Sequence, residues 1–254
     1  MLYQWLFTIK FISLLSFAAG NNSSNIPPLD YRYQCLNQSS VPLSITYQIN
    51  LKDLFTYLSD SASTNSFGHI NLDDDHQNMV YGLYLCRGDV NNTLCNSCVQ
   101  NSTTLLNQHC PNSTSAIMWL PFCVVRYSNQ KFFGKLTIKP RVPMFDATQN
   151  FSGEFDSDAR ILMNGLIQKG SEAPLMFGTH VCNINGTQTR HALVQCSRDI
   201  TREECRTCLR NMVEEVQNCC MEKKVWHVFS PSCVVMYQTQ PFFFIDTLPQ
   251  QGVQ

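Results

Sequence analysis

The chain has 254 residues, 44% of them hydrophobic, and its formal net charge at pH 7 is −1. This length is sufficient for two modest cores, while the small net charge supplies no strong field for nucleic acid or acidic lipid, so we expect neither partner. Its 13 cysteines are about twice the number expected in a cytosolic protein of this size, which indicates an oxidising compartment.

The first 20 residues have the pattern of a secretory signal peptide. Lys10 precedes the apolar run FISLLSFAA at 11–19, and small residues at 18–20 offer a cleavage site. An N-terminal membrane anchor is the alternative, but the run is shorter than the roughly 20 residues that a spanning helix requires. The segment after Phe244 is polar, so we expect neither a C-terminal membrane helix nor a lipid anchor. We therefore predict a protein secreted to the extracellular space.

Eight asparagines precede x-Ser/Thr and are candidate glycosylation sites. Two of them, Asn21 and Asn22, lie just after the predicted signal peptide. The other six are our predicted sites: Asn37, Asn91, Asn101, Asn112, Asn150 and Asn185.

Each half of the chain shows the same order of predicted elements. Helical spacing of apolar residues predicts a first helix over Ile49–Leu58 in one half and over Asp156–Gly170 in the other. Apolar segments that end at cysteines, 81–86 and 191–196, predict strands.

A second helix and a pair of strands complete each half. In the second half Thr201 and Glu204 form a capping box at the start of this helix, and Asn91 is the counterpart of Thr201, where a glycan would compete with capping. Segments rich in valine and aromatic residues around Cys123 and Cys233 predict antiparallel strands. The predicted fold class is α+β, with two helices packed on one small antiparallel sheet, made twice.

The halves are related by a cysteine pattern that recurs at a fixed offset, since Cys86 and Cys196 differ by 110. A period of this length is too long for a solenoid repeat, so each copy is a whole domain. Two prolines in 139–143 separate the copies, and we place the domains at 27–138 and 144–247. The repeated set is Cys86, Cys95, Cys98, Cys110 and Cys123, followed by Cys196, Cys205, Cys208, Cys220 and Cys233.

The C-x8-C-x2-C spacing allows a redox dithiol, a zinc site or a disulfide framework. A redox C-x2-C starts a helix, as this one does, but the duplicated cysteine upstream and the predicted secretion favour structural disulfides. A zinc site lacks a second C-x2-C pair in each domain and a histidine at matching spacing. We expect disulfides and neither a metal nor a cofactor.

These cysteines, with Cys35 upstream, resemble the ginkbilobin-homologous (stress-antifungal) domain of plants. Two copies behind a signal peptide, without a membrane helix or kinase domain, are similar to the cysteine-rich repeat secretory proteins, and the resemblance covers nearly the whole mature chain. Related receptor kinases add a membrane helix to the same ectodomain. The resemblance implies the disulfides Cys35–Cys110, Cys86–Cys95, Cys98–Cys123, Cys196–Cys205 and Cys208–Cys233.

The second copy departs from the family pattern. Phe145 stands where the first copy has Cys35, while Cys182 and Cys219 are additional. We predict that Cys182 bonds Cys220 or Cys219, which leaves one thiol free, because an odd cysteine total requires a free thiol or an intermolecular bond.

Some members of the family bind mannose through an asparagine, an arginine and a glutamate. The first copy has Leu36, Ile117 and Ser128 at these positions. The second copy has Asp146, His227 and Gln238, which are weak candidate ligand-binding residues because they are polar. The alternative is that they are ordinary surface residues.

Other features indicate structure rather than chemistry. The loop Asp73–His76 is typical of solvated carboxylates and lacks the alternating ligands of a calcium loop. None of the six histidines has a recognisable nucleophile beside it, so we expect no enzyme and no catalytic residues. Trp119, Trp226 and Phe242–Phe244 fit a sheet core better than a sugar-stacking platform.

The resemblance implies a secreted, non-enzymatic binding module in plant defence or stress response, with a carbohydrate as its possible ligand. One alternative is a protein that binds homologous membrane receptor ectodomains without a sugar ligand. Another is a redox sensor of the apoplast that works through an unpaired cysteine near Cys219 and Cys220.

Overall fold

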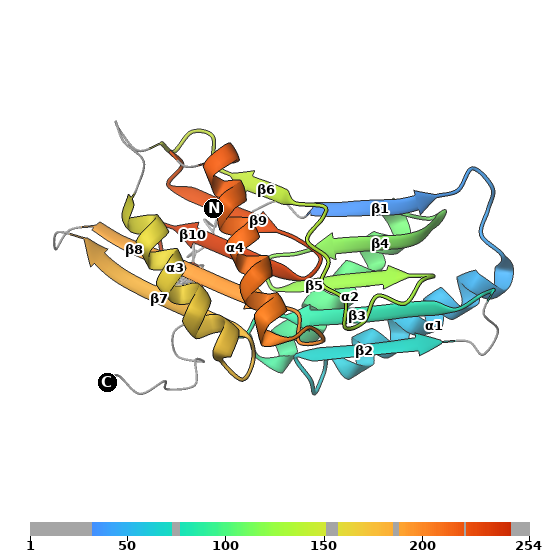
Figure 1. Ribbon diagram of the computed structural model, residues 1–254. Helices are drawn as coiled ribbons and strands as arrows, with labels where there is room; N and C mark the ends of the chain where they lie inside the picture. Colours follow the sequence, from blue (N-terminus) through green and yellow to red (C-terminus); the bar gives the residue numbers. More distant parts are fainter. Residues whose placement is uncertain (1–31, 73–76, 151–156, 185–187, 221, 245–254) are drawn as a thin grey trace, which may run out of the picture.

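The computed structural model describes residues 32–72, 77–150, 157–184, 188–220 and 222–244 (Figure 1). The predicted signal peptide, the Asp73–His76 loop, and the sequons Asn21, Asn22 and Asn185 lie outside the described residues. Two antiparallel sheets of five strands each carry a pair of helices, so the predicted α+β fold, made twice, is confirmed. No helix among the described residues is both long and apolar enough to cross a bilayer.

The two copies have the same topology. The strand order is β1-β4-β5-β3-β2 in copy one and β6-β9-β10-β8-β7 in copy two. Copy one contains β1 (Arg32–Gln38), α1 (Ile45–Ser61), β2 (Phe67–Leu72), β3 (Val80–Cys86), α2 (Asn92–His109), β4 (Ser113–Trp119) and β5 (Cys123–Ser128). Copy two contains β6 (Val142–Phe145), α3 (Ser157–Glu172), β7 (Phe177–Ile184), β8 (Gln188–Cys196), α4 (Arg202–Cys219), β9 (Val225–Phe229) and β10 (Cys233–Gln238).

Local sequence explains the helices. Ser44 caps α1 by accepting a hydrogen bond from the Tyr47 backbone N–H, which extends this helix one turn before the predicted start. The predicted capping box of Thr201 and Glu204 is present at the start of α4.

The outer strands β1, β2, β6 and β7 were not predicted from the sequence. They lie at the edges of the sheets, and the exposed residues of β1 and β2 break the apolar pattern of a strand. Pro143, expected to interrupt regular structure between the copies, lies within the edge strand β6 opposite Val228. An edge strand tolerates proline because one side of its backbone needs no ladder partner.

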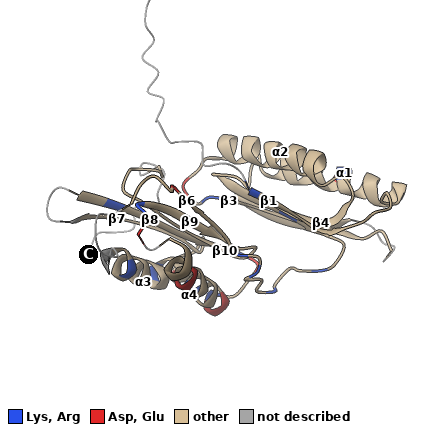
Figure 2. Ribbon diagram, turned by 90° about the horizontal axis from the view of Figure 1, so that it is seen from above, with Lys and Arg blue, Asp and Glu red and all other residues tan. Residues whose placement is uncertain are grey.

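The helix pairs lie on opposite outer sides of the molecule, with the sheets between them (Figure 2). The sheet faces without helices carry an apolar cluster that joins the two copies. Ile117 and Trp119 contribute from copy one, and the Trp119 indole N–H donates to the Ser230 carbonyl oxygen of copy two. Trp226 is buried on the other face of its sheet, which packs against the helices. Both Trp119 and Trp226 are 2% exposed, so they are core residues, as predicted.

The segment that follows the last strand of each copy, β5 or β10, contacts the other copy, and we call this segment the arm. The two arms make equivalent contacts. Asp199 accepts a hydrogen bond from the Gly134 backbone N–H at 2.9 Å, and Asp89 accepts one from the Phe244 backbone N–H at 2.8 Å. The sequence offset relates Asp89 to Asp199 and Gly134 to Phe244, since each pair differs by 110. The contact between the copies therefore has approximate two-fold symmetry at these anchors.

Arg87 strengthens the anchor at Asp89. Its Nε lies 2.6 Å from Asp89 Oδ1, and its Nη2 donates to the Phe242 carbonyl oxygen. Its guanidinium lies 5.0 Å from the Phe122 ring centroid. Both charged side chains are almost fully buried, so each depends on the other for compensation of its charge.

We expect Asp89→Ala to lower the free energy of unfolding by about 3–5 kcal/mol, because it leaves the Arg87 guanidinium buried without its carboxylate. Equilibrium urea unfolding measures this loss. Glu203→Ala is the matched control, since it removes an exposed pair with Arg206 and should cost about 1 kcal/mol or less. Equal losses in the two variants would contradict the role of the anchor.

Six disulfides fasten the helices and strands. Five of them are the bonds that the family resemblance implies: Cys35–Cys110, Cys86–Cys95, Cys98–Cys123, Cys196–Cys205 and Cys208–Cys233. All four cysteines of the two C-x2-C motifs are therefore structural. Such bonds typically contribute about 2–4 kcal/mol each.

The sixth disulfide corrects the predicted partner of Cys182. Cys219 is joined to its neighbour Cys220 at the end of α4, so the predicted bond from Cys182 to either of them is wrong, and neither is the free thiol. Phe145, which stands where copy one has Cys35, is instead covered by the Lys223 ammonium at 5.6 Å from its ring centroid. A cation–π contact thus takes the place of a covalent link between β6 and the region after α4.

Peptide mapping without reduction tests this pairing. Trypsin should release residues 211–223, which contain Cys219 and Cys220, as a single peptide two hydrogen masses lighter than its reduced form. Thiols are alkylated in acid before digestion to prevent exchange. A peptide 211–223 linked to residues 170–190, which contain Cys182, would contradict the structure.

Candidate functional site

Two of the three candidate ligand residues are buried between the copies. His227 on β9 and Gln238 on β10 are 3% and 4% exposed. Their side chains hydrogen-bond each other, with 2.9 Å between His227 Nε2 and Gln238 Nε2. A ligand has no access to this pair in the folded chain.

The arm of copy two covers these polar residues. The Phe242 ring lies 5.8 Å from the His227 ring, and the Phe243 ring lies 5.7 Å from that of the buried His191 on β8. Burial, with the nearby positive charge of Arg87, lowers the pKa of His227 to about 3. Burial also lowers the pKa of His191, so both rings are neutral at neutral pH. Phe242 and Phe243 are thus core residues, as predicted, whereas the prediction is wrong for Phe244, which is 39% exposed at the end of the arm.

Asp146, the third candidate, serves the turn after β6. Its carboxylate accepts hydrogen bonds from the Thr148 backbone N–H and hydroxyl and from the Gln149 side chain. These bonds, that of the Thr148 hydroxyl first, lower the pKa of Asp146. The structure therefore does not bring Asp146, His227 and Gln238 together in an open pocket.

The equivalent positions of copy one are no more accessible. Ile117 is 1% exposed in the cluster between the copies, and Ser128 is 7% exposed. Leu36 is partly buried on the edge strand β1. Of the positions at which the resemblance implied a sugar site, Ile117, Ser128, His227 and Gln238 are therefore buried.

The buried histidines predict a loss of stability in acid. In the unfolded chain these histidines bind protons near their usual pKa of 6.5, whereas His227 in the folded chain stays neutral down to about pH 3. The unfolded state therefore binds more protons in this window, and stability falls as the pH drops below about 6.5, by at most about 1.4 kcal/mol per pH unit for each buried histidine.

We expect His227→Gln to have a shallower loss of stability than the wild type between neutral pH and about pH 4, measured by urea unfolding. His180→Gln replaces an exposed histidine on β7 and should keep the wild-type slope. Parallel pH profiles for the wild type and His227→Gln would contradict this assignment.

Four of the predicted glycosylation sites are exposed: Asn37, Asn91, Asn101 and Asn150, while Asn112 is partly buried. At Asn91, the sequence suggested that a glycan would compete with helix capping. The structure shows that the cap uses Oδ1, which accepts from the Leu94 backbone N–H at 2.9 Å. A glycan is attached through Nδ2, so capping and glycosylation are compatible at this residue.

A large open concavity lies on the helix side of copy one. It is a groove of about 1000 Å³ between α1 and α2. Sequence reasoning missed it, although α2 contains no Asp, Glu, Lys or Arg, which is unusual for an exposed helix. The α1 wall includes Ile45, Ile49, Lys52, Phe55, Thr56 and Asp60, and the α2 wall includes Gln100, Thr103, Thr104 and Asn107.

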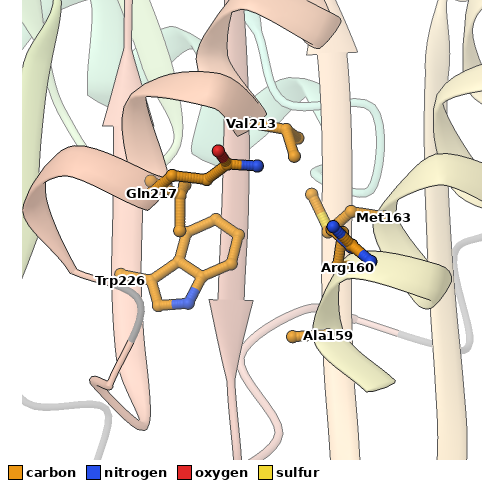
Figure 3. Close-up of a pocket in the computed structure, with 7 residues that line it drawn as sticks. Ala159, Arg160, Met163, Val213, Gln217 and Trp226 are labelled. Atoms are coloured by element: carbon orange, nitrogen blue, oxygen red, sulfur yellow. The ribbon is translucent and has the colours of Figure 1, made fainter. Parts of the chain in front are cut away.

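In copy two, the described residues between the two helices line a much smaller cavity. Among the residues that the structure describes, the cavity between α3 and α4 has a volume of about 20 Å³, and Trp226, Met163 and Val213 line it (Figure 3). Trp226 stands at the position of Ala116 in copy one, since the two differ by 110. α4 also carries acidic and basic residues over its surface, whereas α2 shows none (Figure 2). Copy one thus combines the groove of about 1000 Å³ with a helix, α2, that contains no Asp, Glu, Lys or Arg.

Comparisons with known proteins agree with the duplicated fold. A family model described as "Salt stress response/antifungal" matches residues 34–130 and again residues 145–240. Cysteine-rich repeat secretory protein 38 of Arabidopsis thaliana is 34% identical over 200 residues, which cover 77% of this chain and 78% of that protein. An antimicrobial ginkbilobin-2-like protein of Castanea crenata is 31% identical over 209 residues, covering 82% and 86%.

Longer relatives and solved structures share the same region. Cysteine-rich receptor-like protein kinase 25 of Arabidopsis thaliana is 31% identical over 215 residues, which span 82% of this chain but only 32% of the kinase. The crystal structure of the tandem DUF26 ectodomain of the Arabidopsis thaliana cysteine-rich receptor-like protein PDLP8 superposes with a TM-score of 0.70 at 23% identity, covering 83% of this chain and 98% of the ectodomain. This likeness shows a common fold.

Proposed function

Because the chain belongs to the salt stress response/antifungal family, with two tandem copies of its domain, we propose that it is an extracellular, non-enzymatic recognition protein of plant defence or stress response. Its partners are proteins, among them receptors with a homologous ectodomain. The relatives support this proposal, since they include a secretory protein, an antimicrobial protein and a receptor-like kinase. The six disulfides suit an oxidising extracellular location.

The observation that carries this proposal is the orientation of the two copies. Their sheet faces meet and bury the positions of the implied sugar site, including His227 and Ile117. The helix pairs face outward, and the open groove lies between α1 and α2. Exposed aliphatic side chains at this groove, Ile45 and Ile49, are typical of protein contacts.

The side chains available for catalysis support a non-enzymatic role. Twelve cysteines are held in six disulfides among the described residues. His227 and His191 are buried under phenylalanine rings and cannot exchange protons with a substrate in the folded chain. Recognition needs neither a nucleophile nor a general base.

Two binding measurements on one sample test the proposal. The oxidised, glycosylated chain is passed over the immobilised ectodomain of cysteine-rich receptor-like protein kinase 25, and is applied in parallel to an array of mannose-rich and fungal-wall glycans. We expect saturable binding to the ectodomain that is lost after reduction of the disulfides, and no binding to the array.

The control is the same chain reduced and alkylated, which should lose binding together with its fold. Binding to glycans without binding to the ectodomain would overturn the assignment to protein partners and would restore the carbohydrate alternative. Absence of binding to the ectodomain would likewise count against this receptor as a partner.

A further inference from the structure

Exposed aliphatic residues gather at the start of α1. Val41, Ile45 and Ile49 are 66%, 78% and 54% exposed. Ile45 and Ile49 are one turn apart and therefore lie on the same face of the helix, away from the buried stripe that includes Leu51 and Leu54. Such a group of large apolar side chains in contact with water is the usual mark of an interaction surface.

This ridge continues into the groove between α1 and α2. The groove extends along α1 from Ile45 to Asp60, which corresponds to about 22 Å at 1.5 Å per residue. This length fits another α-helix laid along it, with side chains three and four residues apart as contacts. Because α2 contributes no charged side chain, the far wall neither repels nor selects a charged partner.

The charges on α1 restrict which helix can occupy the groove. Lys52 and Asp60 both line it, both are exposed, and neither has an ion-pair partner among the residues that the structure describes. They lie four residues on either side of Thr56. If a second α1 runs antiparallel with Thr56 at the centre, each Lys52 faces Asp60 of the other helix, whereas a parallel arrangement brings like charges together.

We propose that two copies of this chain dimerise through α1, in an antiparallel arrangement about a two-fold axis near Thr56, with each α1 lying in the groove of the other. A second copy is favoured over an unrelated protein because one helix supplies the aliphatic ridge, one wall of the groove and both members of the charge pair. Such self-complementarity is what a two-fold interface requires.

The neighbouring sequons leave this surface open. Asn91 and Asn101, the predicted glycosylation sites at the start of α2 and within it, are not among the residues that line the groove. Between α3 and α4 of copy two, the described residues line a cavity of about 20 Å³, far smaller than the groove of copy one. The inference therefore goes beyond the proposed recognition of receptors and concerns copy one alone.

Sedimentation velocity over a range of concentrations tests the dimer on the intact chain. We expect a reversible monomer–dimer equilibrium, and Ile49→Asp should weaken it by about tenfold or more, because a carboxylate replaces an aliphatic contact. Ile161→Asp is the matched control: Ile161 is an isoleucine on α3 that is 69% exposed and lies outside the groove, so this change should leave the dissociation constant unaltered.

A charge exchange then tests the antiparallel geometry. Lys52→Asp and Asp60→Lys should each weaken the dimer several-fold, and the double variant should restore it, because each pair regains opposite charges. These residues are exposed, so thermal unfolding should stay near the wild-type temperature.

A wild-type chain that remains monomeric at its highest soluble concentration would overturn the proposal, even if it binds the receptor ectodomain. A dimer that is insensitive to Ile49→Asp, or one that the double exchange does not restore, would overturn it as well. A dimer with the expected responses supports it whether or not the receptor binds, so this test and that of the proposed function have separate outcomes.

Discussion

The two aspartates that bind the arms of the opposite copies determine which surfaces of the molecule remain available. A buried carboxylate is stable only when donors compensate its charge, and Asp89 obtains them from Arg87 and from the backbone N–H of Phe244. The aromatic arms can then cover the inner sheet faces. Once these faces are closed, the outer helices and the groove of copy one are left for recognition.

Much of the architecture was available from the sequence, because it depends on local patterns. The cysteine offset gave the duplication, and the capping box at Thr201 and Glu204 marked the start of α4. The start of α1 was placed too late, since Ile45 and Ile49 lie off its buried stripe and only the Ser44 cap marks that turn. Edge strands such as β1 lacked an apolar pattern because much of their surface stays exposed.

The functional surface was harder to predict because it depends on contacts between distant residues. Asp89 and Phe244 are 155 residues apart in the chain, and no local pattern indicates that they meet. The polar side chains of His227 and Gln238 suggested a ligand site, whereas each satisfies the other in the interior. For the anchors, the sequence offered one signal. Asp199 follows Asp89 by 110 residues, and Phe244 follows Gly134 by the same 110 residues, so the two pairs occupy equivalent positions in the two copies.

The equivalence of the two anchors also bears on how this chain arose. In a symmetric pair of identical domains, any contact from one residue to another must occur a second time with the roles exchanged. Asp89 with Phe244, and Asp199 with Gly134, retain this relation within one polypeptide. This is the pattern that gene duplication and fusion leave when a homodimer of single domains becomes one chain. The two halves now differ in charge, because α2 of copy one contains no Asp, Glu, Lys or Arg, whereas α4 of copy two carries both acidic and basic residues.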